Sequence, residues 1–301
     1  MPKIKVLIIG YGSIGRKYFK ILKKINLIKD ITIYTSQKNI PNSISKINEI
    51  KKINPDIIII STTTDKHYKY LKIVNSTFKN KKILVEKPLF TKLNSIKNIK
   101  NKIFVGYNLR LHPVIMFIKK WMKQKKLISA ELYCGSYLPN WRKQPLKKTS
   151  SYDKKLSGGI LSELSHEIDY ARFLFGNLKN NYLMMRKLSS LKIKDDDYCN
   201  VSFFTKNNSI ININLNYYSL ISKRFIILDT NKGSLLADLI SGNVITKIYS
   251  SNLKKVKIKF KLDNTYKEQI ILLINNKLKK LCSYQDAYRT LKNIKLIKKK
   301  L

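Results

Sequence analysis

The stretch KIKVLIIGYGSIG, residues 3–15, decides the fold of this chain. An apolar run over residues 4–9 leads directly into three glycines, Gly10, Gly12 and Gly15. The residues that follow place apolar side chains at helical spacing. The pattern predicts a strand, a tight turn and a helix.

Each glycine has a separate task in that arrangement. Gly10 permits the turn, Gly12 lets a pyrophosphate approach the backbone, and Gly15 lets the helix pack closely on the strand. The N–H groups at the start of the helix then face the phosphates. The stretch predicts a dinucleotide-binding turn made of Gly10, Tyr11, Gly12, Ser13, Ile14 and Gly15. The alternative is a strand-to-helix turn that binds nothing.

The composition sets the class of protein. The chain has 301 residues and a formal net charge of +43, and that length allows one large or two ordinary domains. Such a charge is typical of nucleic-acid binders, but the lysines are spread over nearly every segment and only residues 295–300 form a cluster. A solvated helix end accounts for that cluster. We expect general attraction to polyanions at low salt and no specific nucleic-acid partner.

The cysteines and the hydropathy indicate a compartment. Cys134, Cys199 and Cys282 are few, odd in number and far apart, which argues against a disulfide framework or a zinc site and for a reducing environment. No run approaches the roughly 18 apolar residues of a membrane span, and the first residues lack a signal-peptide pattern. We expect a cytoplasmic protein with no bound metal and no membrane partner.

The end of the second expected strand, residues 31–34, bears on the cofactor. An NAD-preferring site carries an acid there that binds the ribose hydroxyls, and none is present. Ser36 and Lys38 are suited to receive a 2′-phosphate instead, although a polar loop explains them too. The cofactor prediction is NADP or NAD, with a lean to NADP.

The third expected strand, residues 56–60, is wholly apolar after its first residue, as in a strand buried on both faces of a parallel sheet. It ends in a run of four hydroxyl residues, of which the first three are Ser61, Thr62 and Thr63. These lie where ligands bind in open α/β sheets, so they are candidates for cofactor contacts. Asp65 is the expected cap of the next helix. His67 follows in the first turn, where a structural role is favoured over a catalytic one, although we also count it among the cofactor candidates.

A fourth strand, residues 82–85, runs into Glu86-Lys87-Pro88. Because Pro88 biases Lys87 away from helical geometry, the lysine is expected to project over the sheet edge beside a nicotinamide. Beyond the next strand stands Arg110, one of seven arginines in a lysine-rich chain. It is suited to clamp a carboxylate or phosphate, and an ordinary buried ion pair is an equal alternative.

From residue 127 the pattern changes to successive β-type runs. An alternating half followed by a run of strands predicts an α/β protein with two domains. The first, residues 1–125, is a Rossmann domain with a doubly wound parallel sheet. The second, residues 126–301, is an α+β domain with a large, mostly antiparallel sheet, and its last helix, residues 284–301, is able to pack back on the first.

A helix expected over residues 158–175 carries the densest polar cluster. On it Ser162, His166 and Asp169 share one face, and Glu163 is within one turn of His166. An imidazole beside carboxylates can donate or accept a proton near neutral pH. Taken alone, a buried histidine with satisfied hydrogen bonds is the better interpretation.

Five motifs occur in order along most of the chain: GYGSIG, STTTDKH, EKP, GYNLRLHP and GGILSELSHEID. Together they resemble the Gfo/Idh/MocA family of NAD(P)-dependent oxidoreductases. The segment GSYLPNWR, residues 135–142, with Ser151 and Tyr152, is most similar to members that act in bacterial surface-sugar pathways.

The resemblance implies an enzyme that moves a hydride between the nicotinamide and a carbinol or ketone carbon of a sugar or nucleotide sugar. It implies that Lys87 polarises or protonates the substrate oxygen, that His166 is its partner, and that Asp169 holds His166 or binds substrate hydroxyls. The amine of Lys87 and the imidazole of His166 are expected to converge on one nicotinamide carbon. It also implies a homodimer or homotetramer, formed in many members through the open face of the second sheet.

The further site predictions are Glu86, Trp141 and Arg142 at the cofactor, and Asn108, Arg110 and Tyr152 at the substrate. The resemblance implies that Trp141 and Arg142 face the cofactor. A packed aromatic beside a solvated cation is an equal alternative for Trp141 and Arg142.

One departure from the family pattern concerns the acid before the histidine. Many members carry an aspartate four residues before it, where this chain has Ser162, and Glu163 stands three residues before it. Either Glu163 takes that role, or the role is lost and the substrate differs. The rival hypothesis is a regulatory protein of the same fold that binds the dinucleotide without turnover.

Overall fold

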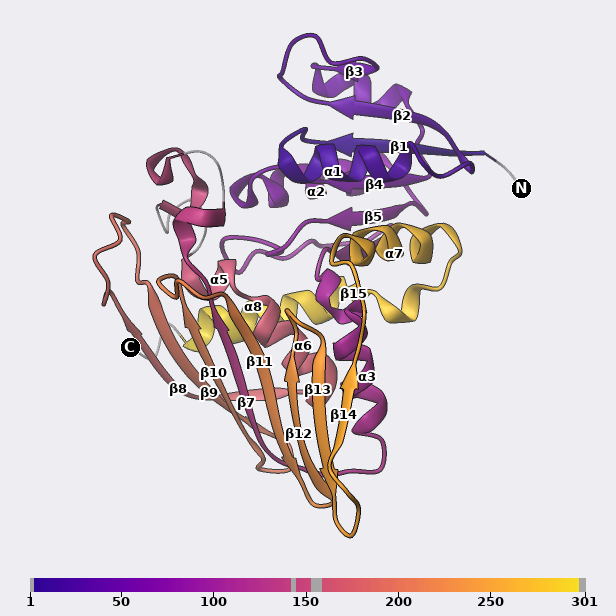
Figure 1. The fold of residues 1–301 in the computed structure, drawn as a ribbon. Helices are drawn as coiled ribbons and strands as arrows, with labels where there is room; N and C mark the ends of the chain where they lie inside the picture. The colour runs from indigo at the N-terminus through magenta and orange to yellow at the C-terminus, as the bar shows by residue number, and fades with distance from the viewer. Residues whose placement is uncertain (1–2, 142–144, 153–158, 298–301) are drawn as a thin grey trace. The chain divides into compact units, whose positions relative to one another are not determined.

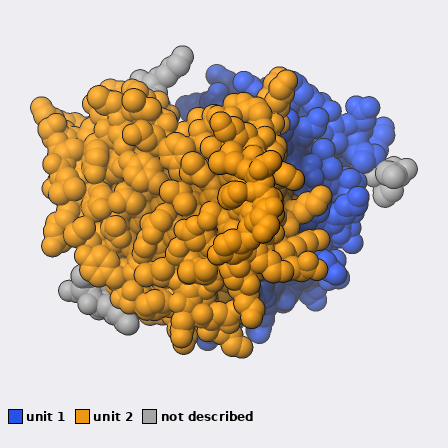
Figure 2. Space-filling model, turned by 60° about the horizontal axis from the view of Figure 1, so that its bottom comes forward, with its two compact units in different colours: residues 1–108, 263–288 blue, residues 109–262, 289–301 orange. Residues whose placement is uncertain are grey.

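The computed structural model describes residues 3–141, 145–152 and 159–297. The chain divides into two compact units (Figure 2, blue and orange). The first comprises residues 1–108 and 263–288, and the second residues 109–262 and 289–301. Residues 109–125 therefore group with the second unit and residues 263–288 with the first. The predicted boundary between two domains, with the first ending at residue 125 and the second beginning at residue 126, stays a prediction.

The sheet of the first unit has seven strands in the order β15-β6-β5-β4-β1-β2-β3 (Figure 1). They are β1 (Ile4–Ile9), β2 (Ile28–Tyr34), β3 (Ser43–Ile44), β4 (Ile57–Ile60), β5 (Lys82–Val85), β6 (Lys102–Val105) and β15 (Cys282–Ser283). All pairs are parallel except β15 with β6. The strand order reverses between β1 and β4, which is where ligands bind in doubly wound sheets. The predicted Rossmann fold is confirmed.

The interior of this sheet follows from its sequence. Every residue of β4, the tetrapeptide Ile57–Ile60, is buried, as are the last four residues of β1. A parallel sheet covered on both faces requires such continuous apolar runs.

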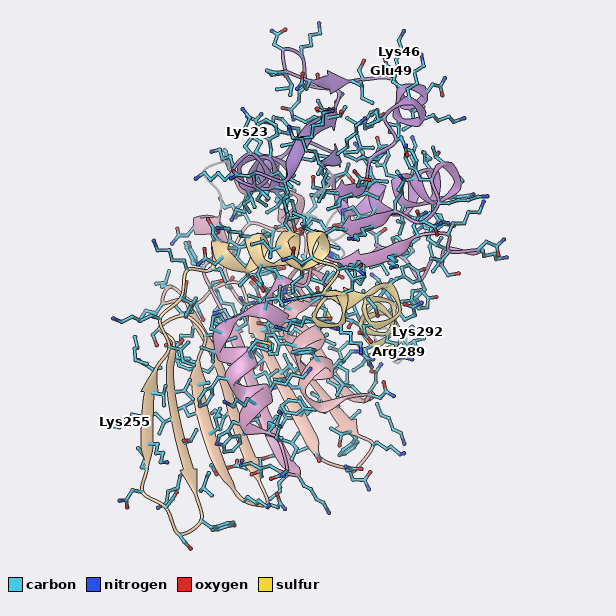
Figure 3. All side chains as sticks on the ribbon, turned by 90° about the vertical axis from the view of Figure 1, so that its right-hand side faces the viewer. Lys23, Lys46, Glu49, Lys255, Arg289 and Lys292 are labelled. Atoms are coloured by element: carbon cyan, nitrogen blue, oxygen red, sulfur yellow. The ribbon has the colours of Figure 1, made fainter. Side chains whose placement is uncertain are left out.

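The helices of the first unit correct two predictions. They are α1 (Ser13–Leu22), α2 (Thr64–Thr77), α7 (Asp263–Ile274) and short 3₁₀ turns at Ile47–Lys52 and Leu278–Lys280. Thr63 precedes α2 as its N-cap, so Asp65 lies in the first turn and is not the cap. The sequence also predicts a short helix over residues 44–53, and the structure has only the 3₁₀ turn at Ile47–Lys52 there. There Glu49 accepts a hydrogen bond from the backbone N–H of Lys46, the neighbour labelled beside it in Figure 3.

The second unit contains an eight-stranded sheet in the order β14-β13-β12-β11-β7-β10-β9-β8 (Figure 1). Its strands are β7 (Leu127–Gly135), β8 (Leu178–Arg186), β9 (Tyr198–Thr205), β10 (Ile210–Asn216), β11 (Lys223–Thr230), β12 (Gly233–Asp238), β13 (Asn243–Ile248) and β14 (Lys254–Lys257). Only the pair β7 and β10 is parallel. The predicted large, mostly antiparallel sheet is confirmed.

The helices of the second unit cover one face of this sheet. They are α3 (Pro113–Trp121), α5 (Ile160–Glu163), α6 (His166–Phe175) and the later part of α8 (Tyr284–Ile297). Buried residues of these helices and of the central strands form one apolar core, which includes Ile115, Ile168, Ile213 and Ile294. Short 3₁₀ turns lie at Asn108–Leu111, Leu138–Trp141, Leu146–Lys148 and Ser150–Tyr152.

The continuous helix expected over residues 158–175 is wrong. Leu164 has φ −97° and ψ 33°, which ends α5, and α6 begins two residues later after Ser165. Ser162 therefore lies on α5, whereas His166 and Asp169 lie on α6. The sequence alone does not reveal the break, because ILSELSHEID contains neither proline nor glycine.

The other face of the sheet is open in this chain. Ile227 on β11 pairs with Leu236 on β12, and both side chains are more than a third exposed. The edge strand β14 carries lysines, among them Lys255 (Figure 3). Exposed lysines on an edge strand discourage pairing with another sheet.

Candidate active site

The glycine turn of the first unit has the geometry that the sequence predicts. Gly10 has a φ of +95°, and a Cβ there would lie 2.9 Å from Thr62. A Cβ on Gly15 would lie 2.2 Å from the Gly10 carbonyl oxygen, so these two glycines are required by the packing of the turn. A Cβ on Gly12 would meet no atom within 4 Å. The space beside Gly12 is therefore open to a ligand.

The start of α1 adds an electrostatic preference for anions. Its N-cap is Gly12, so no side chain caps the N–H groups at the start of the helix. The first turn of α1 contains no acidic residue. Gly12 and Ser13 are exposed, while Tyr11 and Ile14 are half-buried. Exposed N–H groups at a helix start attract phosphate. The turn thus fits a dinucleotide pyrophosphate.

The end of β4 braces the glycine turn. The Ser61 hydroxyl donates to the carbonyl of Gly10 at 2.9 Å, and the Ser61 N–H donates to Ile9 at 2.8 Å. Thr62 is half-buried and Thr63 exposed. Ser61 thus holds the turn, and the next two residues lie at the edge where a ligand is expected.

Arg16 on α1, which was not among the predicted site residues, reaches the loop that follows β2. The Arg16 guanidinium donates to Gln37 Oε1 at 2.9 Å and to the Tyr11 carbonyl at 3.3 Å, and it lies 5.0 Å from the centre of the Tyr11 ring. Gln37 also donates to the Tyr11 carbonyl, at 3.0 Å. Ser36 and Lys38 flank Gln37 and are exposed. The signal was a basic residue directly after the last glycine of the motif.

Lys87 lies in a turn held from both sides. On one side, Glu86 Oε2 accepts the backbone N–H of Lys87 at 3.3 Å, and Glu86 Oε1 accepts the Tyr18 hydroxyl at 2.7 Å. On the other side, His67 Nδ1 lies 3.0 Å from the Pro88 carbonyl oxygen. The Lys87–Pro88 peptide bond is cis, and the Lys87 side chain is half-buried.

The first-unit candidates His67, Glu86 and Asn108 are buried and already bonded. His67 Nε2 lies 3.2 Å from the Thr62 carbonyl oxygen, and burial lowers the pKa of His67. This environment fits the structural role. Asn108 donates to the Thr265 hydroxyl at 2.7 Å. Roles for Glu86 and Asn108 at the ligand stay predictions.

In the second unit, the Arg110 guanidinium and the Asp169 carboxylate form a two-pronged ion pair. Both hydrogen bonds measure 2.8 Å, and the two side chains are 5% and 1% exposed. The guanidinium also lies 5.2 Å from the centre of the Phe173 ring. Of the two alternatives given for Arg110, the structure has the buried ion pair. Asp169 is thereby held on the same helix as His166.

The acid offered as a substitute, Glu163, lies at the end of α5. Its carboxylate accepts the hydroxyl of the buried Ser151 at 2.7 Å. Tyr152 is half-buried, and its carbonyl accepts the backbone N–H of Lys194 at 2.8 Å. Ser162 is buried. A role for Glu163 in proton transfer stays a prediction.

Trp141 is half-buried and packs against the apolar core of the second unit. Its indole N–H donates to the Ser136 hydroxyl at 2.9 Å, and its ring meets the Tyr217 ring edge-on at 5.4 Å. Arg142 lies outside the described residues.

A second ion pair of α6 was not predicted from the sequence, and it joins the buried Glu167 to the half-buried Arg224. Arg224 on β11 donates to Glu167 at 2.7 Å, and Tyr170 donates to the same oxygen at 3.3 Å. Burial and the Glu167 charge raise the pKa of Tyr170 well above its ordinary value. The only sequence signal was a second acid beside Asp169 in a chain with few arginines.

The three cysteines are free thiols and buried. Among the described residues, no cluster of His, Cys, Asp and Glu side chains is arranged to hold a metal ion. In the same part of the chain, no helix has the length and apolar character needed to cross a membrane.

Two family models match the chain. The model described as the oxidoreductase family, NAD-binding Rossmann fold, matches residues 4–103, and the GFO/IDH/MocA C-terminal domain matches residues 119–235. The matches take in the glycine turn, Lys87 and the segment with His166. The fold, the glycine turn and the first of these models together define an oxidoreductase with an NAD-binding Rossmann domain. The chain belongs to the GFO/IDH/MocA family.

A curated relative and several solved structures resemble the chain. Levoglucosan dehydrogenase of Pseudarthrobacter phenanthrenivorans is 26% identical over 133 residues, which are 41% of this chain and 34% of the relative. The match thus spans about a third of that relative's length. A structure of levoglucosan dehydrogenase in complex with NADH has a TM-score of 0.85 at 14% identity, covering 99% of this chain and 96% of that one.

Two further structures have the same fold. UDP-N-acetylglucosamine 3-dehydrogenase from Acidithiobacillus ferrooxidans has a TM-score of 0.78 at 13% identity, covering 99% of this chain and 97% of that one. A putative NADPH-dependent oxidoreductase from Desulfitobacterium hafniense has a TM-score of 0.82 at 16% identity, with 98% and 94% covered.

Proposed function

We propose that this protein transfers a hydride between a nicotinamide dinucleotide and a carbinol or ketone carbon of a sugar or nucleotide sugar. The observation that carries the proposal is the position of Lys87. It follows β5, and the glycine turn follows β1, with only β4 between these two parallel strands. The lysine and the turn therefore lie on the same carboxyl edge of the sheet. The names of the sugar dehydrogenases that share the fold support the substrate class.

A bound dinucleotide would supply or accept the hydride. The part of this chain is to bind the pyrophosphate on α1 and to exchange the proton. Lys87 donates to the substrate oxygen as alkoxide character develops, or accepts the proton in the reverse direction. His166 serves as the second proton-transferring residue, as the family resemblance implies. The Arg110 and Asp169 pair orients α6, which begins with His166.

The proposal is tested by following the oxidation of NADPH or NADH in a stopped-flow instrument, with keto-sugars and UDP-keto-sugars as substrates. Lys87→Ala should lower the turnover rate by at least about a hundredfold and leave the dinucleotide Kd unchanged. Lys92→Ala, an exposed lysine of the same connection, should leave both unchanged. Dinucleotide binding without turnover of any sugar would support the regulatory alternative.

We propose NADP(H) as the preferred cofactor. Arg16, which Gln37 and Tyr11 hold beside Ser36 and Lys38, supplies a cation at the strand end where the 2′ substituent of the adenosine ribose belongs. The absence of an acid among residues 35–38 supports the same preference.

Fluorescence titration with NADPH and NADH tests this preference. Arg16→Ala should weaken NADPH binding by about tenfold or more, as expected for a charged hydrogen bond, and leave NADH binding nearly unchanged. The control is Lys23→Ala, since Lys23 is the C-cap of the same helix. Equal losses for both dinucleotides would contradict the preference.

We also propose a homodimer or homotetramer that buries the open sheet face with Ile227 and Leu236, acting in the cytoplasm. The similarity of residues 135–142 to members of surface-sugar pathways supports a place in surface polysaccharide biosynthesis.

A further inference from the structure

Directly behind Lys87, a buried carboxylate is bonded to a buried phenol. Glu86 is 7% exposed and Tyr18 is 0% exposed. The two residues are 68 positions apart, and their oxygens lie 2.7 Å from each other. The bond joins α1, the helix of the glycine turn, to the residue before Lys87.

The surroundings of Glu86 are shaped to hold this carboxylate. A Cβ on Gly106 would lie 2.7 Å from Glu86 Oε1, so only glycine leaves the carboxylate its place. The Gln269 amide oxygen on α7 lies 3.3 Å from the Tyr18 hydroxyl. Because a phenol has one proton, the shorter contact identifies Glu86 as its acceptor.

We infer that Tyr18 and Glu86 form a positioning pair for Lys87, in which the ionised carboxylate holds the Lys87 N–H and the Tyr18 hydroxyl holds the carboxylate. The importance of Lys87 rests on the proposed function. The pair acts on the backbone of Lys87 and does not itself touch the substrate.

The charges around the pair agree with this role. Burial raises the pKa of Glu86 above its ordinary value, and the Tyr18 hydrogen bond, Lys87 and Lys17 each oppose that rise. Burial and the Glu86 charge raise the pKa of Tyr18 well above its ordinary value, so Tyr18 stays a donor. Tyr266 on α7 is a further titratable group beside the pair, since its ring centre lies 5.8 Å from that of Tyr18, and Asp263 acts on Tyr266 in turn. Without the Tyr18 hydroxyl, burial is less opposed, and Glu86 takes up a proton at higher pH.

Two NMR signals of the ligand-free protein test the inference: the Glu86 carboxyl carbon, assigned by its loss in Glu86→Gln, and the Lys87 amide proton. Both should titrate with one midpoint. Tyr18→Phe should raise that midpoint by about one pH unit or more. Gly106→Ala, which displaces the carboxylate and leaves Tyr18 intact, should also raise it. Tyr266→Phe removes a neighbouring hydroxyl and should not.

Equal midpoints in Tyr18→Phe and Tyr266→Phe, or a Lys87 amide that does not follow Glu86, would overturn the inference. With a sugar that the enzyme turns over, kcat falls on acidification, and in Tyr18→Phe this fall should begin at a higher pH than in the wild type. KM and the dinucleotide Kd should be unchanged. A wild-type pH profile in Tyr18→Phe would also overturn it. The NMR titration needs no substrate. If no sugar is turned over, the proposed function fails while the NMR titration still tests the pair.

Discussion

Single glycines separate the requirements of the fold from those of the ligand. Gly12 has an ordinary backbone conformation and open space around its missing Cβ, whereas a Cβ on Gly15 meets the backbone of Gly10. The same change to alanine therefore has different consequences three residues apart.

We expect Gly12→Ala to change the free energy of unfolding by less than about 1 kcal/mol and to weaken dinucleotide binding at least tenfold, since the methyl group occupies the phosphate approach. Gly15→Ala should destabilise the protein by about 1–3 kcal/mol or more through overpacking. Chemical denaturation and dinucleotide titration measure the two effects. Unimpaired binding by a folded Gly12→Ala would contradict the assignment of the turn.

The ion pair of Arg110 with Asp169 also belongs to this scale. Because removal of one partner leaves a buried charge uncompensated, Arg110→Ala should cost about 3–5 kcal/mol of unfolding free energy. Lys17→Ala, which breaks the exposed pair with Asp263, should cost less than about 1 kcal/mol. Denaturant unfolding of both variants makes the comparison, and similar losses would show that the burial of the first pair is unimportant.

At the scale of elements, α3 depends on an unusual cap. His112 is buried, and its Nδ1 accepts the Val114 N–H at the start of the helix. Burial, with a contribution from the positive charge of Arg224, lowers the pKa of His112 to about 4. The ring is therefore neutral in the folded protein under ordinary conditions.

This cap makes stability depend on pH. Between its unfolded pKa of about 6.5 and about 4, the unfolded chain binds a proton that the folded chain does not. Stability should therefore fall on acidification, by roughly 2 kcal/mol from about pH 7 to pH 5. His112→Asn keeps a capping oxygen without the titration, so its loss over that range should be smaller. Denaturation curves at several pH values measure this difference, and parallel losses would refute it.

At the scale of the whole molecule, the open face of the second sheet is the surface through which we propose that copies of this chain assemble. If the proposed oligomer buries this face, Ile227→Lys should release monomers, because a charge would replace a buried apolar contact. Ile99→Lys changes a comparably exposed isoleucine elsewhere and should leave the assembly intact. Sedimentation velocity distinguishes these outcomes, and a monomeric wild type would remove the proposal.

Local sequence patterns by themselves determined the class of fold and the glycine turn. Apolar periodicity, glycine spacing and strand-end residues act over a few positions, which is why β1 with α1, the run of parallel strands and the turn at Lys87 could be predicted. The change to β-type runs likewise predicted the second sheet, since successive side chains of a strand point to opposite faces and apolar and polar residues alternate along it.

Only the tertiary structure decided which polar groups pair. Tyr18 meets Glu86, Arg110 meets Asp169 and Arg224 meets Glu167 across 68, 59 and 57 positions. No local pattern encodes such partners, because they follow from how the elements pack. The break between α5 and α6 has the same origin, since its residues suit a continuous helix as well as two short ones.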